Sequence, residues 1–241
     1  MTRIYSFEGN IGSGKSTLIT LLEKEKKLCS YFLNNIVYLH EPVDIWASIK
    51  GRDGITILEK FYNDQEKYAF SFQMMAYVSR IAQLRNAIKK NPHAIFITER
   101  SVYTDKNVFA KMLYDNGKIE QVDYEIYLKW FEEFTQDLPL NGIIYIRTEP
   151  EICNERIKVR NRTGETVPLE YSVRCHDYHE TWIKNMDCRI LTLNGNESNI
   201  HSVKDGWSEQ ITEFIHPKHL ERTMSSAAPH IAHDSLMNIC K

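Results

Sequence analysis

The sequence has no long hydrophobic run, and it lacks the N-terminal pattern of a signal peptide. Its longest apolar stretches, such as Ala94–Ile97, are far shorter than the ~20 residues that cross a bilayer. A strand-like segment begins already at Arg3, which does not fit a secretory leader. These absences predict a cytoplasmic protein without a membrane partner.

Paired cysteine motifs and an excess of one charge are missing as well. Five cysteines are scattered without CxxC spacing, which is typical of reduced thiols. The 30 Lys and Arg residues nearly balance the 32 Asp and Glu residues, whereas nucleic-acid-binding domains usually carry a basic surplus. We therefore expect no nucleic-acid partner. The 241 residues, 42% of them hydrophobic, suffice for one large globular domain.

Short apolar segments alternate with longer amphipathic ones along the chain. This alternation predicts an α/β fold with a five-stranded parallel sheet and helices on both faces. The expected strands are 4–7, 36–39, 94–98, 142–146 and 189–193. The expected helices are 15–27, 43–50, 55–90 with a break near Asn63, 103–113, 120–137, 149–160 and 169–185. A capping box at Thr148–Glu151 predicts the start of the sixth helix.

The last 25 residues differ from the rest in composition. Residues 217–241 contain no Phe, Trp or Tyr. We expect one domain over 1–216 followed by a poorly packed tail, the alternative being a short docked helix over 234–239.

A glycine-rich loop after the first strand fits the pattern GxxxxGK[ST]. The motif consists of Gly9, Asn10, Ile11, Gly12, Ser13, Gly14, Lys15, Ser16 and Thr17. Its backbone amides and the following helix N-terminus are suited to phosphate oxygens, while Lys15 supplies charge and the Ser16 hydroxyl suits Mg²⁺. The alternative is a plain glycine-rich turn. The loop predicts a bound nucleoside triphosphate but leaves water, a phosphate or a hydroxyl open as the acceptor.

Charged residues follow the second and third strands, at the edge where ligands of such sheets bind. Glu41 suits a general base for a hydroxyl acceptor, although it also suits a helix N-terminus before Pro42. Glu99 suits the surroundings of Mg²⁺, and Arg100 suits charge stabilisation of a transferring phosphoryl group. The alternative for Arg100 is a surface ion pair.

Two helices carry further polar candidates. In the long helix, Phe72, Ala76 and Arg80 share one stripe, and Gln73 and Arg80 are unsuited to a core unless they face a polar ligand. Later, residues 156–162 carry four positive charges and no negative one. We interpret that segment as an Arg-rich lid over the triphosphate, the alternative being a solvated basic face.

Together these residues resemble the cellular and viral deoxynucleoside kinase family over about residues 3–193. The matching segments are GNIGSGKST, EPVDIW, the FQ…SR helix, ERSVYTDKNVFA, GIIYIRTEPEICNERI and PLEYSVRCHDYHETW. The resemblance implies a P-loop kinase fold, a homodimer, and Mg²⁺ with ATP or another nucleoside triphosphate as phosphate donor. It further implies that the chain phosphorylates the 5′-hydroxyl of deoxynucleosides in nucleotide salvage.

The resemblance also implies a role for each site residue. Glu41 is the base for the 5′-hydroxyl, Arg100 stabilises the transition state, and Glu99 and Ser16 help to hold Mg²⁺. Tyr62 and Glu170 hold the sugar 3′-hydroxyl. The base is sandwiched by Trp46 and Phe72, and Gln73 reads its edge. The lid arginines are Arg156, Arg160 and Arg162.

The choice of base rests on Ala76, Arg80 and Asp105, which are similar to the deoxycytidine and deoxyguanosine branch of the family. A carboxylate accepts a hydrogen bond from an exocyclic amino group but repels the 4-oxo group of thymine. We therefore expect deoxycytidine or purine deoxynucleosides as acceptors. The alternatives are a thymidine or broad-specificity kinase, a nucleoside monophosphate kinase, and a kinase-like structural subunit without activity.

Overall fold

The computed structural model of the chain describes residues 2–25, 35–162, 165–197 and 206–216. Within these ranges, five strands form one sheet in the order β2-β3-β1-β4-β5, and all neighbouring pairs are parallel. The strands are β1 (Arg3–Glu8), β2 (Ile36–Leu39), β3 (Ile95–Glu99), β4 (Gly142–Arg147) and β5 (Ile190–Asn194). The predicted parallel sheet is thereby confirmed.

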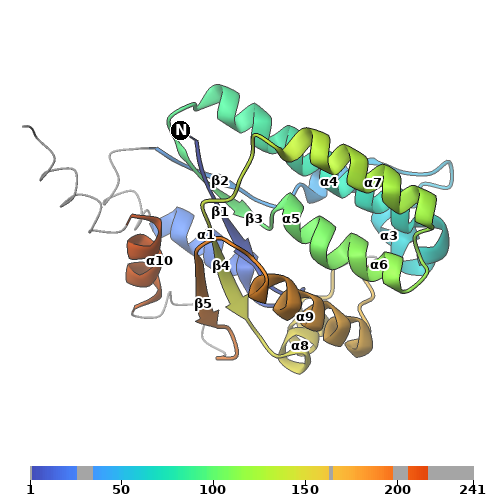
Figure 1. The fold of residues 1–241 in the computed structure, drawn as a ribbon. Coiled ribbons are helices and arrows are strands. Elements are labelled where there is room, and N and C mark those ends of the chain that lie inside the picture. Colours follow the sequence, from blue (N-terminus) through green and yellow to red (C-terminus); the bar gives the residue numbers. More distant parts are fainter. Residues whose placement is uncertain (1, 26–34, 163–164, 198–205, 217–241) are drawn as a thin grey trace, which may run out of the picture.

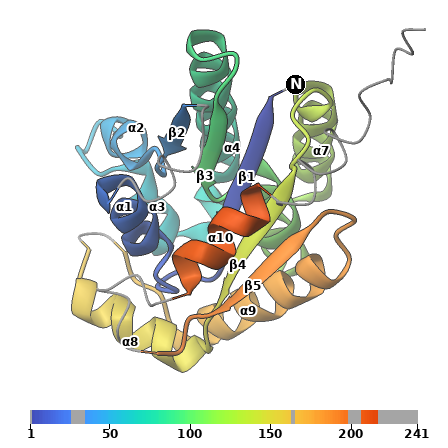
Figure 2. The same ribbon diagram turned by 90° about the vertical axis from the view of Figure 1, so that its left-hand side faces the viewer.

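Alternating side chains of the strands pack against helices on the two faces of the sheet. On one face, Tyr5 and Phe7 of β1 pack with α1 (Lys15–Glu25) and α10 (Trp207–Ile215), the two helices in front of the sheet in Figure 2. On the other face, Ile4 of β1 packs with α4 (Gln65–Lys90). Trp182 of α9 (Leu169–Lys184) packs against β4 on that second face as well.

The remaining helices complete the structure around the sheet. They are α2 (Val43–Ser48), α3 (Ile57–Asn63), α5 (Val102–Thr104), the π-helical turn η1 (Asp105–Ala110), α6 (Lys111–Asp115), α7 (Gln121–Thr135) and α8 (Pro150–Arg160). The predicted break near Asn63 is confirmed, because Asp64 caps α4 by accepting from the Lys67 amide at 3.2 Å. In Figure 1, α4 and α7 run side by side on the flank away from α10.

The start of α8 differs from the predicted capping box in one detail. The helix begins at Pro150, so Glu149 and not Thr148 occupies the cap position. Thr148 Oγ1 instead donates to the Ser13 carbonyl of the phosphate loop at 3.3 Å. The threonine therefore joins β4 to the loop and does not cap the helix.

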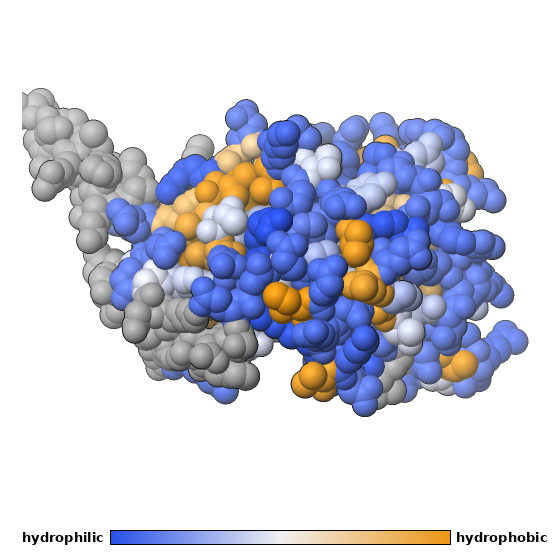
Figure 3. Space-filling model, turned by 90° about the horizontal axis from the view of Figure 1, so that it is seen from below, coloured by the Kyte–Doolittle hydropathy of each residue, from blue (hydrophilic) through white to orange (hydrophobic). Residues whose placement is uncertain are grey.

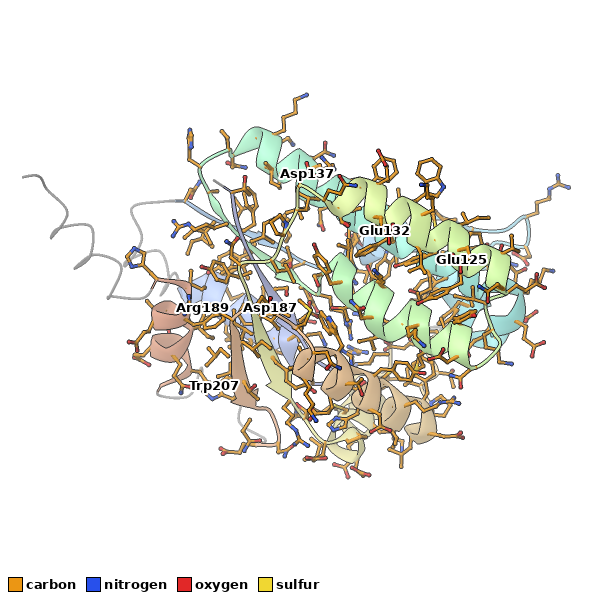
Figure 4. The ribbon with its side chains drawn as sticks, viewed as in Figure 1. Glu125, Glu132, Asp137, Asp187, Arg189 and Trp207 are labelled. Atoms are coloured by element: carbon orange, nitrogen blue, oxygen red, sulfur yellow. The ribbon has the colours of Figure 1, made fainter. Side chains whose placement is uncertain are left out.

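The prediction did not include α10, although the sequence carried a signal for it. Trp207, Ile211, Phe214 and Ile215 recur at helical spacing, and the last three are buried against the sheet. The Glu209 carboxylate caps the helix by accepting from the Gly206 amide at 2.9 Å. Figure 4 shows Trp207 at the α10 end of the molecule.

Three predictions concern residues outside the described ranges: the tail over 217–241, the end of the helix predicted over 15–27, and the break in the lid at Gly164. Among the described helices, none combines the length and the apolar character that crossing a bilayer requires. Seen from below, the surface is largely hydrophilic, and its hydrophobic residues gather toward the α10 side (Figure 3).

Candidate active site

A cavity of about 850 Å³ lies at the carboxyl ends of β1, β2 and β3, next to the phosphate loop. Most of the predicted site residues line it. They are Ile11, Gly12, Gly14, Lys15, Ser16, Thr17, Glu41, Trp46, Tyr62, Phe72, Gln73, Ala76, Arg80, Glu99, Arg100, Asp105, Arg156, Arg160 and Arg162. Gly9, Asn10 and Ser13 lie behind this surface and contact Lys15.

The backbone of the phosphate loop requires its glycines. Gly9, Gly12 and Gly14 have φ angles of 143°, 80° and 100°, a region that other residues rarely adopt. A Cβ atom on Gly12 would lie 2.5 Å from the Cys153 carbonyl oxygen. The loop leads into α1, which begins at Lys15, so its amides and the helix N-terminus form a site for anions.

Lys15 is buried beneath the loop. Its Nζ donates to the Asn10 carbonyl at 2.7 Å and to the Gly9 carbonyl at 3.0 Å. Burial lowers the pKa of Lys15 to about 7, and the positive charge of Arg100 acts in the same direction. A triphosphate beside Nζ would favour the protonated form and raise this pKa.

We expect triphosphate binding to drive proton uptake by Lys15 above neutral pH. At about pH 8.5 the free side chain is mostly neutral and the bound one is charged, so about one proton is taken up per site. Near pH 6 both states are protonated and the uptake vanishes. Calorimetry in buffers of different ionisation enthalpy measures the uptake, and K15M should abolish it. Equal uptake in K15M and the wild type would contradict this assignment.

The carboxylate of Glu41 lies between two arginines at the mouth of β2. Its Oε1 accepts from Arg80 Nη2 at 2.6 Å and from Arg100 Nη1 at 3.0 Å. Burial raises the pKa of Glu41, but the charges of Arg100 and Arg80 outweigh it and hold the pKa below its usual value. Glu41 is therefore ionised at neutral pH and can accept a proton.

Arg100 has an unusual backbone conformation at the end of β3. Its φ angle of 60° lies in the left-handed region, where a non-glycine residue is strained by ~1–3 kcal/mol. The Arg100 amide donates to the Phe7 carbonyl at 3.0 Å, and Nη2 donates to the Gly9 carbonyl at 3.3 Å. These contacts turn the guanidinium group toward the phosphate loop and Glu41.

The side chains of Ser16 and Glu99 contact each other, so both are close enough to bind the same metal ion. Ser16 Oγ donates to Glu99 Oε1, and His40 Nδ1 lies 3.8 Å from Glu99 Oε2. Burial raises the pKa of Glu99, but His40, Ser16 and the charge of Lys15 lower it to about 2. A hydroxyl and an ionised carboxylate are hard oxygen ligands that fit Mg²⁺. Among the described residues, no three His, Cys, Asp or Glu residues could hold a metal alone, so phosphate oxygens would complete the site.

The base was predicted to lie between Trp46 and Phe72, and this sandwich stays a prediction. Both side chains line the cavity. Their rings contact each other edge to face, with centroids 5.7 Å apart and planes at 75°. In this arrangement the two rings form one wall of the cavity, and Phe61 stacks on Phe72 at 4.6 Å.

Polar groups for a base edge lie next to this wall. Gln73 is 2% exposed, and its Oε1 has no hydrogen-bond partner among the described residues; a buried amide of this kind normally has one. Arg80 Nε lies 3.1 Å from Asp105 Oδ2, so these two candidate residues form an ion pair. Burial raises the pKa of Asp105, and the charge of Arg80 opposes this effect.

Phe109, which was not predicted from the sequence as a site residue, also lines the cavity, one helical turn after Asp105.

The structure does not bring Glu170 to Tyr62. The Glu170 side chain is 83% exposed and pairs with Arg174 on the surface of α9. Glu165 lines the cavity instead, with a side chain only 6% exposed. Burial, together with the negative charge of Glu165, raises the pKa of Tyr62. The sequence signal for Glu165 was its position directly after the basic segment, where a carboxylate can turn back over the site.

The basic segment lies at the edge of the cavity. Arg156 and Arg160 are on α8, and Arg162 follows it. Arg160 pairs with Glu165, and an Arg156 nitrogen lies 3.2 Å from the Glu197 carbonyl oxygen. Gly164, the predicted break in the lid, lies outside the described residues. Closure of the segment over a ligand therefore stays a prediction.

A parallel sheet with a phosphate loop beside an ionised carboxylate places the chain among the phosphate-loop proteins that bind nucleoside triphosphates. Comparison with known proteins narrows this class. The family model for deoxynucleoside kinase matches residues 5–216. The chain belongs to the deoxynucleoside kinase family, as its motifs predicted, and is a phosphotransferase that acts on a hydroxyl group.

Similar proteins come from a virus and from vertebrates. A probable deoxycytidine kinase of fowlpox virus is 37% identical, with 79% of this chain and 77% of the relative covered. Human deoxycytidine kinase is 32% identical, with 87% and 90% covered. A mitochondrial deoxyguanosine kinase of Xenopus laevis is 29% identical, with 87% and 88% covered. These relatives support the predicted branch of the family.

Proposed function

We propose that the chain transfers the terminal phosphate of ATP, or of another nucleoside triphosphate, to the 5′-hydroxyl of deoxycytidine or a purine deoxynucleoside. The observation that carries this proposal is the buried, ionised Glu41 beside the phosphate loop. A hydroxyl acceptor requires a base at this position, whereas an anionic phosphate acceptor would be repelled by it. The names of the relatives agree with such acceptors.

In the proposed reaction, the sugar hydroxyl gives its proton to Glu41 as its oxygen bonds to the terminal phosphorus. The bond from that phosphorus to the bridging oxygen breaks, and the nucleoside diphosphate leaves with this oxygen. The guanidinium group of Arg100, 3.0 Å from Glu41, stabilises the charge on the transferring group. The loop amides and Lys15 hold the remaining phosphates. Ser16 and Glu99 would hold Mg²⁺, which neutralises phosphate charge when it is bound.

The proposed sugar and base sites lie in different parts of the same cavity. Tyr62 and Glu165 lie where a sugar hydroxyl could bind, so we assign to this pair the role that the sequence gave to Tyr62 and Glu170. We assign the base to the part of the cavity lined by Phe72, Gln73 and Phe109. There the Arg80–Asp105 pair can read an exocyclic amino group.

Two neighbouring carboxylates provide a matched test of the sugar site. E165Q should raise the KM for the deoxynucleoside about tenfold or more, since it replaces a buried charged acceptor. E170Q should leave KM unchanged, because the Glu170 side chain is exposed and pairs with Arg174 on the surface. Steady-state kinetics with deoxycytidine measure both. A larger effect of E170Q than of E165Q would indicate that Glu170, and not Glu165, binds the sugar hydroxyl.

A direct test of the proposed function compares nucleosides with their monophosphates. We expect labelled phosphate to pass from ATP to deoxycytidine but not to deoxycytidine 5′-monophosphate. Transfer to the monophosphate alone would identify a nucleoside monophosphate kinase. A folded protein without transfer to any nucleoside would favour a structural subunit.

We also propose that the chain forms a homodimer through α4 and α7. Exposed apolar residues recur every fourth position on α7, and Val78 of α4 adds to them. The members on α7 are Val122, Ile126, Trp130 and Phe134. A contiguous apolar face of this kind is typical of a protein interface. Arg85 of α4 joins the two helices through Asp137, which Figure 4 shows just beyond α7.

For this interface we expect W130E to convert a dimer into monomers, because it places a charge in the centre of the apolar face. V173E is the matched control, since Val173 is an exposed valine on α9. Sedimentation of both variants measures the mass. A monomeric wild-type protein, or a W130E dimer as stable as the wild type, would contradict the proposal.

A further inference from the structure

His40 lies between two carboxylates that belong to different parts of the phosphate site. Its Nε2 is 3.0 Å from Glu23 Oε2 on α1, the helix that begins within the phosphate loop. Its Nδ1 is 3.8 Å from Glu99 Oε2 at the end of β3. The His40 carbonyl accepts from Gln83 Nε2 of α4 at 3.1 Å, which fixes the backbone at this position.

The two oxygens of Glu99 have different partners. Oε1 meets the Ser16 hydroxyl, while Oε2 faces His40 and the Glu41 amide, which is 3.5 Å away. His40 therefore lies beside the oxygen that Ser16 does not contact. Without the imidazole, Oε2 would keep its contact with the Glu41 amide, and the carboxylate could rotate more freely. Groups that orient a metal-binding carboxylate in this way typically change metal affinity 10–100-fold when they are removed.

We infer that His40 is a positioning residue that holds Glu99 with Oε1 toward the magnesium site at Ser16, and that Glu23 anchors its ring to the phosphate-loop helix. This inference rests on the proposed function, because it takes Ser16 and Glu99 as the groups that hold Mg²⁺. His40 lines the cavity next to Glu41. Because its ring lies against Glu23 and Glu99, we expect its main effect on binding of the metal–nucleotide.

The test compares H40Q and E23Q with H93Q, a change at an exposed histidine before β3. Calorimetry gives the affinity for ATP with and without Mg²⁺, and the spectrum of Mn²⁺ gives metal binding without turnover. H40Q should weaken Mg·ATP binding about tenfold and leave metal-free ATP binding unchanged. E23Q should act in the same direction with a smaller loss, and H93Q should have no effect.

In kinetics, H40Q should raise the Mg²⁺ concentration for half-maximal rate while kcat at saturating Mg²⁺ stays near that of the wild type. Thermal unfolding identifies any variant that loses its fold. Equal weakening of ATP binding with and without Mg²⁺ would show that His40 only supports the structure, and an unchanged Mg·ATP affinity would overturn the inference. If the wild-type protein transfers no phosphate, the proposed function fails, while the binding comparison still decides the role of His40.

Discussion

E41Q should bind deoxynucleosides nearly as well as the wild type but turn over ~10²–10⁴-fold more slowly, the usual contribution of a general base. The glutamine keeps the shape of the side chain and can still accept from Arg80 and Arg100, the two groups that now contact Glu41 Oε1. It has no negative charge and cannot take the proton of the sugar hydroxyl. Steady-state and binding measurements separate these two effects.

The matched control for E41Q is D44N, which removes an exposed carboxylate from neighbouring α2. D44N should retain the wild-type turnover. If E41Q also retains it, Glu41 is not the base, and the role of the carboxylate reduces to placing the two arginines.

The second prediction concerns selection of the nucleobase. R80M combined with D105A should shift the preference between deoxycytidine and thymidine toward thymidine by about 10²-fold in the ratio of kcat/KM. Asp105 is buried beside the Arg80 guanidinium group. Removing it takes away the acceptor for an exocyclic amino group and the repulsion of the thymine 4-oxo group.

Absolute rates of this double variant should fall, because Arg80 also contacts Glu41 at 2.6 Å; the ratio between substrates is therefore the decisive quantity. R85M combined with D137A is a matched control, since it removes an exposed Arg–Asp pair with a 2.6 Å contact. The control should leave the substrate ranking unchanged. If the combined R80M and D105A variant keeps the wild-type ranking of deoxynucleosides by kcat/KM, Arg80 and Asp105 do not select the base.

The parts of the site that lie on strand ends and on the phosphate loop could be predicted from the sequence. Glu41 lies two residues after β2, and Glu99 and Arg100 lie at the end of β3. Parallel strands bring their carboxyl ends to one edge of the sheet. The loop motif fixes Lys15 and Ser16 because its spacing determines its backbone. The local sequence therefore indicates most of the residues proposed to take part in phosphate transfer.

The contacts that depend on packing between distant elements could not be predicted. Trp46 and Phe72 both line the cavity, but the angle between their rings is set by how α2 meets α4 and by Phe61, which stacks on Phe72. Similarly, the exposed Glu170 and the buried Glu165 are close in sequence, and only the fold shows which one turns into the cavity.

The proposed function is phosphorylation of a deoxynucleoside hydroxyl, with the base selected through Arg80 and Asp105. Its most direct test is the transfer of labelled terminal phosphate from ATP to deoxycytidine, deoxyguanosine, deoxyadenosine and thymidine in parallel, with the product position identified by phosphorus NMR. We predict 5′-monophosphates from deoxycytidine or the purine deoxynucleosides, with thymidine the poorest acceptor. A preference for thymidine, or phosphate at any other position, would contradict the account.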